Sequence, residues 1–146
     1  ERAALMRGGY ALPVLAAALL TLAPAPAQAA GAPSFRIWSN PQGSVRVRAH
    51  SCGQEMCGTV VWANAKAQAD ARKGGMDKLV GAMLFKNFVR EREGLWRGKV
   101  YVPDIDKTFS GTVTLVDPRT LKASGCLLGR IGCKSQVWTR VDKPTP

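Results

Sequence analysis

Four cysteines and one histidine are the side chains of this sequence best suited to bind a metal, carry out redox reactions or form crosslinks. Cys52 and Cys57 are separated by four residues in the stretch HSCGQEMCGTVVW, which begins at His50. Cys126 and Cys133 form a second pair, separated by six residues. Such residues serve as ligands of structural zinc, as groups of thiol oxidoreductases, or as the ends of disulfides in exported proteins.

The spacings favour disulfides. An even count of cysteines in a small exported domain is typical of a disulfide framework, and four cysteines allow three connectivities. We predict Cys52–Cys57 and Cys126–Cys133, because each pair brackets a glycine-containing turn and facing residues of a tight hairpin can reach disulfide distance. A zinc site would require both pairs to converge, and only the first has the usual spacing of zinc ligands. Neither pair has the C-x-x-C spacing of thiol oxidoreductases or of haem attachment.

A second pattern with chemical content lies in the stretch VYVPDIDKTF. Asp104, Asp106 and Thr108 fit D-x-D-x-T, which resembles the first motif of haloacid dehalogenase-like phosphatases. That chemistry also needs a magnesium site and a phosphate-binding lysine on a large α/β domain. The residues after Thr108 are few and have a β pattern, so we interpret the segment as a polar turn.

No other catalytic pattern is present. The sequence has no G-x-S-x-G, S-x-x-K or H-E-x-x-H motif, and any hydrolase triad would depend on His50 alone. We therefore predict no catalytic residues, no metal, no cofactor and no enzymatic activity.

Most of the chain around these residues has the sequence pattern of β-strands. Apolar and polar residues alternate with a period of two in SVRVRAH, LWRGKVYV and FSGTVTLV. Shorter candidates are Phe35–Ser39, Thr59–Trp62, Met83–Arg90, Leu121–Leu127 and Ser135–Val141. Asn-Pro-Gln-Gly, Glu-Gly and Asp-Pro-Arg stretches supply turn signals between them. Residues 64–75 depart from the alternation and are expected to form a helical turn or a surface loop.

About eight short antiparallel strands in so short a chain predict a closed barrel or a sandwich. An eight-stranded barrel can be filled by side chains or can hold one small ligand. The periodicity does not distinguish these alternatives.

The amino-terminal segment predicts export. Arg2 and Arg7 precede an apolar run, and Ala27-Gln28-Ala29 fits a signal-peptidase site, so cleavage is expected after Ala29. Residues 1–29 would be a signal peptide and residues 30–146 one β-barrel domain in the periplasm or medium, with no later membrane-spanning segment. Loss of Glu1, Arg2 and Arg7 lowers the formal charge from +11 to +10. This surplus favours anionic envelope components, and export argues against nucleic acid.

Four stretches together resemble the DUF2147 family of small exported bacterial proteins of uncharacterised function. Residues 52–62, 79–81, 96–109 and 125–140 are similar to four family patterns. In chain order these are C-G…L-C-G-x-I-x-W/L, L-x-G, W-x-G-G-x-I-Y-D-P…G-K-T-Y and G-C…C-x-x-Q-x-W-T-R. The chain departs from them at Val102, where the family usually has Asp, and at Asp106, where it has Gly. The resemblance implies a lipocalin-like barrel with a central apolar cavity and supplies no catalytic residues.

Two functions follow as hypotheses. The first is a non-enzymatic protein that binds a small hydrophobic or amphipathic molecule in a barrel cavity. The residues expected near that cavity are Phe85, Trp96, Val100, Tyr101, Phe109 and Val113. The second is an envelope protein that binds anionic lipid, polysaccharide or a protein partner through its basic outer surface. The residues expected on that surface are Arg46, Arg48, Arg97 and Lys99.

Overall fold

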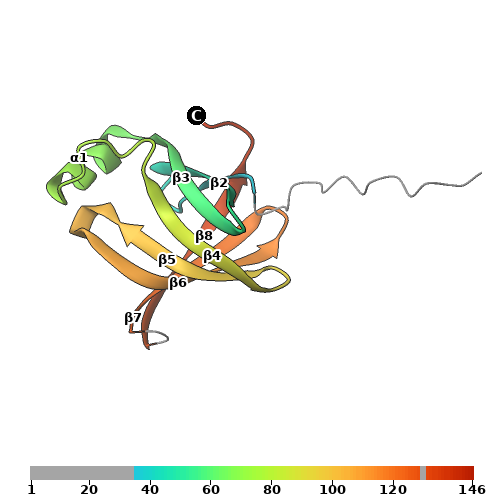
Figure 1. Cartoon of the computed structure of the whole chain (residues 1–146). Coiled ribbons are helices and arrows are strands. Elements are labelled where there is room, and N and C mark those ends of the chain that lie inside the picture. Colours follow the sequence, from blue (N-terminus) through green and yellow to red (C-terminus); the bar gives the residue numbers. More distant parts are fainter. Residues whose placement is uncertain (1–34, 129–130) are drawn as a thin grey trace, which may run out of the picture.

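Eight antiparallel strands pair in chain order and close into a barrel, because β1 pairs with both β2 and β8 (Figure 1). This computed structural model describes residues 35–128 and 131–146, and the predicted signal peptide lies outside them. The strands are β1 Ile37–Ser39, β2 Val45–Cys52, β3 Glu55–Ala63, β4 Met83–Arg92, β5 Leu95–Val102, β6 Lys107–Asp117, β7 Thr120–Leu128 and β8 Ile131–Val141. The all-β barrel prediction is confirmed, and the pairing of β1 with β8 excludes a sandwich.

The core follows from the alternation in the strands. In β2, Val47 is buried while Arg48 beside it is exposed. The barrel interior is filled mainly by tryptophan, phenylalanine and β-branched side chains. Its most buried large residues are Trp38, Phe88 and Val60. Burial of such aromatic and aliphatic side chains is the main force that stabilises a domain of this size.

The segment between β3 and β4 contains one helix, α1, Ala65–Lys73. The Asn64 side chain caps it by accepting a hydrogen bond from the Ala67 backbone N–H at 2.8 Å. The helix ends against a short 3₁₀-helix, η1 (Pro103–Ile105), so closely that a Cβ on Gly74 would lie 1.8 Å from the Pro103 carbonyl oxygen. The predicted excursion at residues 64–75 is therefore a helix docked on the barrel.

Neither helix of the described chain is long and apolar enough to cross a membrane.

The up-and-down topology gives the barrel two distinct ends. At the Cys52 end, the turns β2–β3, β4–β5 and β6–β7 lie near the start of β1 and the end of β8. At the α1 end lie α1, η1 and the connection from β7 to β8. In Figure 1 the α1 end is on the left, and the β7–β8 hairpin extends beyond the neighbouring strands at the bottom.

Candidate functional site

A groove of about 570 Å³ lies at the Cys52 end of the barrel. It lies where β1 begins between β2 and β8. Its lining residues are Phe35, Arg36, Ile37, Arg48, Ala49, His50, Arg140, Val141 and Asp142. We call it the rim groove. Typical small-molecule sites have volumes of about 300–1,000 Å³, so the rim groove has the size of a ligand site.

Strand register explains how the rim groove is built. Ile37 pairs with both Arg48 and Val141, so these three side chains share the outer face of the barrel. Trp38, which is buried in the core, pairs with Arg140, and therefore Arg140 lies on the inner face. The groove thus crosses the rim from the outer to the inner face.

The chemistry of the rim groove is amphipathic and cationic. Phe35, Ile37 and Val141 supply apolar surface, and Ile37 is only 8% exposed although it lies on the outer face. The basic side chains are Arg36, Arg48 and Arg140, against one acidic side chain, Asp142. Within residues 35–128 and 131–146, none of these three guanidinium groups has a hydrogen-bond or ion-pair partner. Guanidinium groups form charge-assisted, often bidentate hydrogen bonds to carboxylate and phosphate.

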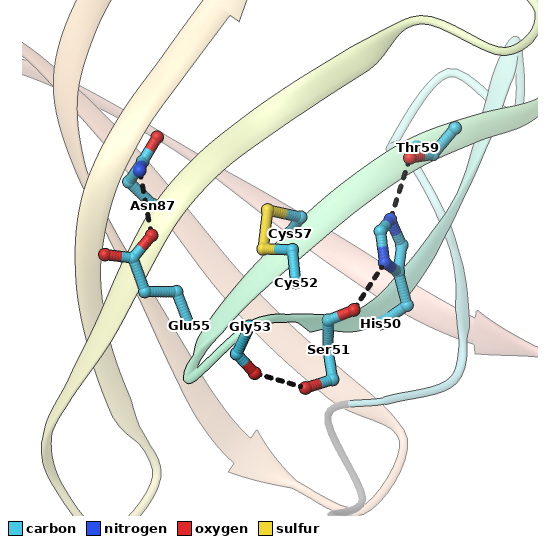
Figure 2. The surroundings of a disulfide bond; sticks show 8 residues. All are labelled: His50, Ser51, Cys52, Gly53, Glu55, Cys57, Thr59 and Asn87. Carbon is cyan, nitrogen blue, oxygen red and sulfur yellow. Dashed lines mark hydrogen bonds between the residues drawn. A yellow bond between two sulfur atoms is a disulfide. The ribbon is translucent and has the colours of Figure 1, made fainter.

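His50 lines the rim groove, but both nitrogens of its ring already have hydrogen-bond partners. Nδ1 lies 3.1 Å from the Ser51 carbonyl oxygen and Nε2 lies 2.9 Å from Oγ1 of Thr59 (Figure 2). Since a carbonyl only accepts, Nδ1 carries a proton and donates it. Both ring nitrogens are therefore engaged, which holds the ring in place and leaves no free basic nitrogen in this arrangement.

The barrel interior contrasts with the groove. Its cavity has a volume of about 30 Å³. It is lined by Trp38, Val47, Ala49, Met56, Gly58, Phe85, Val113, Leu121, Ala123 and Trp138. A water needs about 10–15 Å³ on this scale, so the cavity has room for about two or three waters. The packing corrects the expectation of a ligand-sized cavity inside the barrel: Phe85 packs edge-on against Trp138, with 5.7 Å between ring centroids, and fills the space.

The six residues expected near a cavity are only partly brought together. Phe85 and Val113 line the 30 Å³ space, and Trp96 is buried in the surrounding core. Val100 and Phe109 face each other in the β5–β6 ladder.

Tyr101 lies on the opposite face of β5 from Trp96. Its hydroxyl donates a hydrogen bond of 2.8 Å to Asp106, and the Lys86 ammonium lies 5.5 Å from its ring centroid. The hydrogen bond to Asp106 raises the pKa of Tyr101, with burial as a smaller cause. These contacts stabilise the β5–β6 turn and do not point to a ligand site.

The four residues predicted to form a basic surface do not form one patch. Arg46 and Arg48 lie on β2, whereas Arg97 and Lys99 lie on β5, with two strands between them. Arg97 pairs with Glu91, and Lys99 donates a hydrogen bond to Ser110. Arg46 lies over the Trp62 ring at 5.6 Å. Only Arg48 belongs to the rim groove.

The cysteines form the two disulfides predicted from the hairpin turns, Cys52–Cys57 and Cys126–Cys133 (the first is shown in Figure 2). They lie at opposite ends of the barrel, so all four sulfurs are distant from a common centre and bonded in pairs. Sulfurs bonded in disulfides cannot serve as zinc ligands or as free thiols, so the disulfide prediction is confirmed over these two alternatives. Asp106, the second acid of the D-x-D-x-T pattern, adopts a left-handed conformation with φ 49° and ends η1, as the turn interpretation requires.

Sequence reasoning missed most of the rim groove. Arg36 and Arg140 are more than a hundred residues apart and become neighbours only because β1 closes the barrel against β8. A signal was present, since residues 118–141 contain five basic and no acidic side chains. It did not indicate which basic residues would converge.

Two comparisons with known proteins bear on this geometry. A family model described as "Uncharacterized protein conserved in bacteria (DUF2147)" matches residues 37–140. Among solved structures, the protein HP1028 from Helicobacter pylori, described as belonging to the lipocalin family, is similar with a TM-score of 0.60. The two are 13% identical, and the alignment covers 75% of this chain and 84% of that protein, which shows a shared fold. A search of curated proteins found no match.

Proposed function

The chain belongs to the DUF2147 family, and we propose that it is an exported, non-enzymatic protein that binds a single-chain amphipathic anion, such as a fatty acid, in the rim groove. The observation that carries the proposal is the set of three arginines without ion-pair partners, in the described residues, beside an apolar wall. The wall would contact the chain of the ligand, and the arginines would bind its anionic head.

Desolvation and charge favour this class of ligand over neutral ones. Arg140 is half-buried, so its guanidinium loses hydration without gaining an ion pair, and an anion that pairs with it binds with additional free energy. Arg36 and Arg48 are exposed and add positive charge beside it. Arg48 reaches the groove from the outer face beside Ile37, and Arg140 reaches it from the inner face beside Trp38. A carboxylate at the rim, between the two faces, could therefore be bound by both guanidinium groups.

The 30 Å³ interior cavity supports a location at the rim instead of the barrel centre. Ala49 borders both the rim groove and the interior cavity. The end of an alkyl chain could therefore approach the interior at Ala49 without displacement of Trp38 or Trp138. Export is supported by the two disulfides, which form and persist in oxidising compartments.

Binding without catalysis is proposed because the groove offers no activated group. Its histidine has both ring nitrogens engaged, and its other polar side chains are three arginines and Asp142. Nucleophilic or general-base chemistry would need a free nucleophile or base directed at the ligand.

The test is isothermal titration calorimetry with dodecanoate, and with dodecanol and dodecyltrimethylammonium as chains of equal length with neutral and cationic heads. We expect dodecanoate to bind most tightly. The double variant Arg48→Gln/Arg140→Gln should weaken dodecanoate binding about tenfold or more, because charged hydrogen bonds contribute about 1.5–3 kcal/mol each. The matched control is Arg72→Gln/Arg92→Gln, which makes the same charge change at exposed sites away from the groove. Equal affinity for dodecanol, or equal losses in both double variants, would contradict the proposal.

A further inference from the structure

The end of the β7–β8 hairpin exposes three large apolar side chains. Leu127, Leu128 and Ile131 are 70%, 72% and 72% exposed, the highest values among the large apolar residues of the described chain. We call these three residues the hairpin tip. Figure 1 shows that this hairpin projects past the neighbouring strands of the barrel. Exposed large apolar side chains that are grouped in one element often mark interaction sites in soluble proteins.

The hairpin tip is apolar on both of its faces. Leu128 pairs with Ile131 across the ladder, so these two side chains share one face. Leu127 precedes Leu128 in the strand and therefore points to the other face. A flat protein surface would cover only one of these faces. An apolar layer into which the tip inserts would cover both faces.

A disulfide lies directly behind the hairpin tip. Cys126 pairs with Cys133 in the ladder, next to Leu127, and the two are joined by a disulfide. The disulfide restricts the conformations of the two strands where they leave the barrel, so their immobilisation at a membrane would lose less conformational entropy.

The charge behind the tip has one sign. Neither β7 nor β8 contains an acidic residue. Lys122 pairs with Val137 on one face, and Lys134 pairs with Gly125 on the other, so each face of the hairpin carries a lysine behind its apolar end. Both lysines are exposed. An apolar end with lysines behind it on each face complements an anionic bilayer, whose hydrocarbon boundary lies beneath negatively charged headgroups.

We infer that the hairpin tip inserts into the interfacial layer of an anionic phospholipid bilayer, with Lys122 and Lys134 against the headgroups. This inference goes beyond the proposed ligand and uses residues at the opposite end of the barrel from the rim groove. The rim groove then faces away from the bilayer, and its dodecanoate affinity should be independent of the hairpin tip.

The experiment is co-sedimentation with vesicles of phosphatidylglycerol and phosphatidylcholine, and with phosphatidylcholine alone. The test variant is Leu127→Ser/Leu128→Ser/Ile131→Ser. The control variant is Val89→Ser/Val116→Ser, which changes exposed apolar side chains, 55% and 60% exposed, outside this hairpin. The parent and both variants keep the same amino-terminal apolar segment, so any vesicle binding by that segment is equal in all three proteins. Thermal unfolding of each variant checks that the barrel is intact.

We expect binding to the anionic vesicles, about tenfold or more weaker in the tip variant and unchanged in the control, because burial of each apolar side chain changes a partition constant by about a decade or more. A Leu128→Trp variant should shift its fluorescence to shorter wavelength on anionic vesicles, which reports entry of this position into an apolar layer. Equal binding of the tip variant and the parent, or no binding to anionic vesicles, would overturn the inference. Loss of a dimer in the tip variant without vesicles would assign the tip to a second copy of the chain instead.

Discussion

Glycine lies opposite aromatic or branched side chains at three positions of the barrel interior. A Cβ on Gly58 would lie 2.9 Å from the Phe85 ring, and a Cβ on Gly98 would lie 2.6 Å from the Phe88 ring. A Cβ on Gly111 would lie 2.5 Å from Val100. These distances are shorter than van der Waals contact, so the absent side chains make room for the packing that fills the barrel.

Gly98→Ala should therefore lower the free energy of unfolding by about 2–3 kcal/mol, as overpacking of a core does. The added methyl group would contact both the Phe88 ring and the Lys86 carbonyl oxygen, and a backbone oxygen cannot move aside cheaply. Urea unfolding measures the change. The matched control is Gly125→Ala, whose Cβ would lie 3.7 Å from Phe109, in ordinary contact. We expect a change of no more than about 0.5 kcal/mol there. Similar losses in both variants would contradict a specific role for the close approach at Gly98, because the lower chain entropy of alanine by itself stabilises the folded state.

The alternation in the sequence predicted which strands contribute to the core. It could not predict which aromatic side chains of β4 point into the barrel. Phe85 and Phe88 are three apart, so a regular strand would place them on opposite faces. The ladder shifts register between Lys86 and Val89, and Asn87 adopts φ 55°, which turns both rings inward. Asn87 also donates a hydrogen bond to Glu55 (Figure 2). This bulge depends on a partner strand, and alternation within β4 does not reveal it.

At the scale of elements, each disulfide connects the two strands of one hairpin. Cys52–Cys57 lies at the β2–β3 turn, where Cys57 is only 5% exposed. Cys126 is the last residue of β7 that pairs with β6, so Cys126–Cys133 lies where the β7–β8 hairpin leaves the barrel. Two bonds of similar loop length are therefore placed in regions of different packing, and they should contribute differently to global stability.

Removal of each disulfide separates these contributions. Cys52→Ala/Cys57→Ala should lower Tm by about 5–10 °C, since a loop this short contributes about 2 kcal/mol to stability. Cys126→Ala/Cys133→Ala should lower Tm less and mainly increase amide exchange in residues 126–133, because the hairpin end can open while the barrel stays folded. Scanning calorimetry and hydrogen exchange measure these effects. A larger loss of Tm from the second pair would contradict the local role of the β7–β8 disulfide.

The unsubstituted protein should contain no free thiol, because all four cysteines are bonded in pairs. Thiol titration of the denatured, unreduced protein measures this.

Comparison of the predicted and observed bounds of strands and helix shows which features the alternation of apolar and polar residues predicts. The strand predicted from LWRGKVYV matches β5, Leu95–Val102, and the excursion predicted at residues 64–75 contains α1. The strand predicted to begin at Ser135 instead begins at Ile131, and the one predicted to begin at Thr59 begins at Glu55. Both extensions run toward a disulfide, where the ladder continues past the last alternating residues. Their regularity comes from cross-strand pairing, which no single strand encodes.

At the scale of the molecule, the barrel closes through its shortest strand. β1 has three residues, and it alone joins β2 to β8. Its ladders pair Ile37 to Ser39 with residues 46–48 and 139–141. One further backbone hydrogen bond, from Ala49 to the Arg36 carbonyl at 2.9 Å, continues the pairing toward the rim groove. So short a seam has few hydrogen bonds to lose, and it should open before the rest of the barrel.

A ligand in the rim groove would contact both sides of this seam, because Arg48 belongs to β2 and Arg140 to β8. Saturating dodecanoate should therefore slow amide exchange in residues 36–39, 47–49 and 139–141 more than elsewhere. At a ligand concentration 100 times Kd, linkage predicts about 2.7 kcal/mol of added global stability, which raises Tm as well. Mass spectrometry of exchanged peptides measures the local effect, with dodecanol as the control ligand. Protection centred instead on Trp96, Val100 and Phe109 would place the ligand among the packed side chains of the barrel interior and contradict the rim site. Protection at the seam would mean that the ligand stabilises the barrel where its strands meet most weakly.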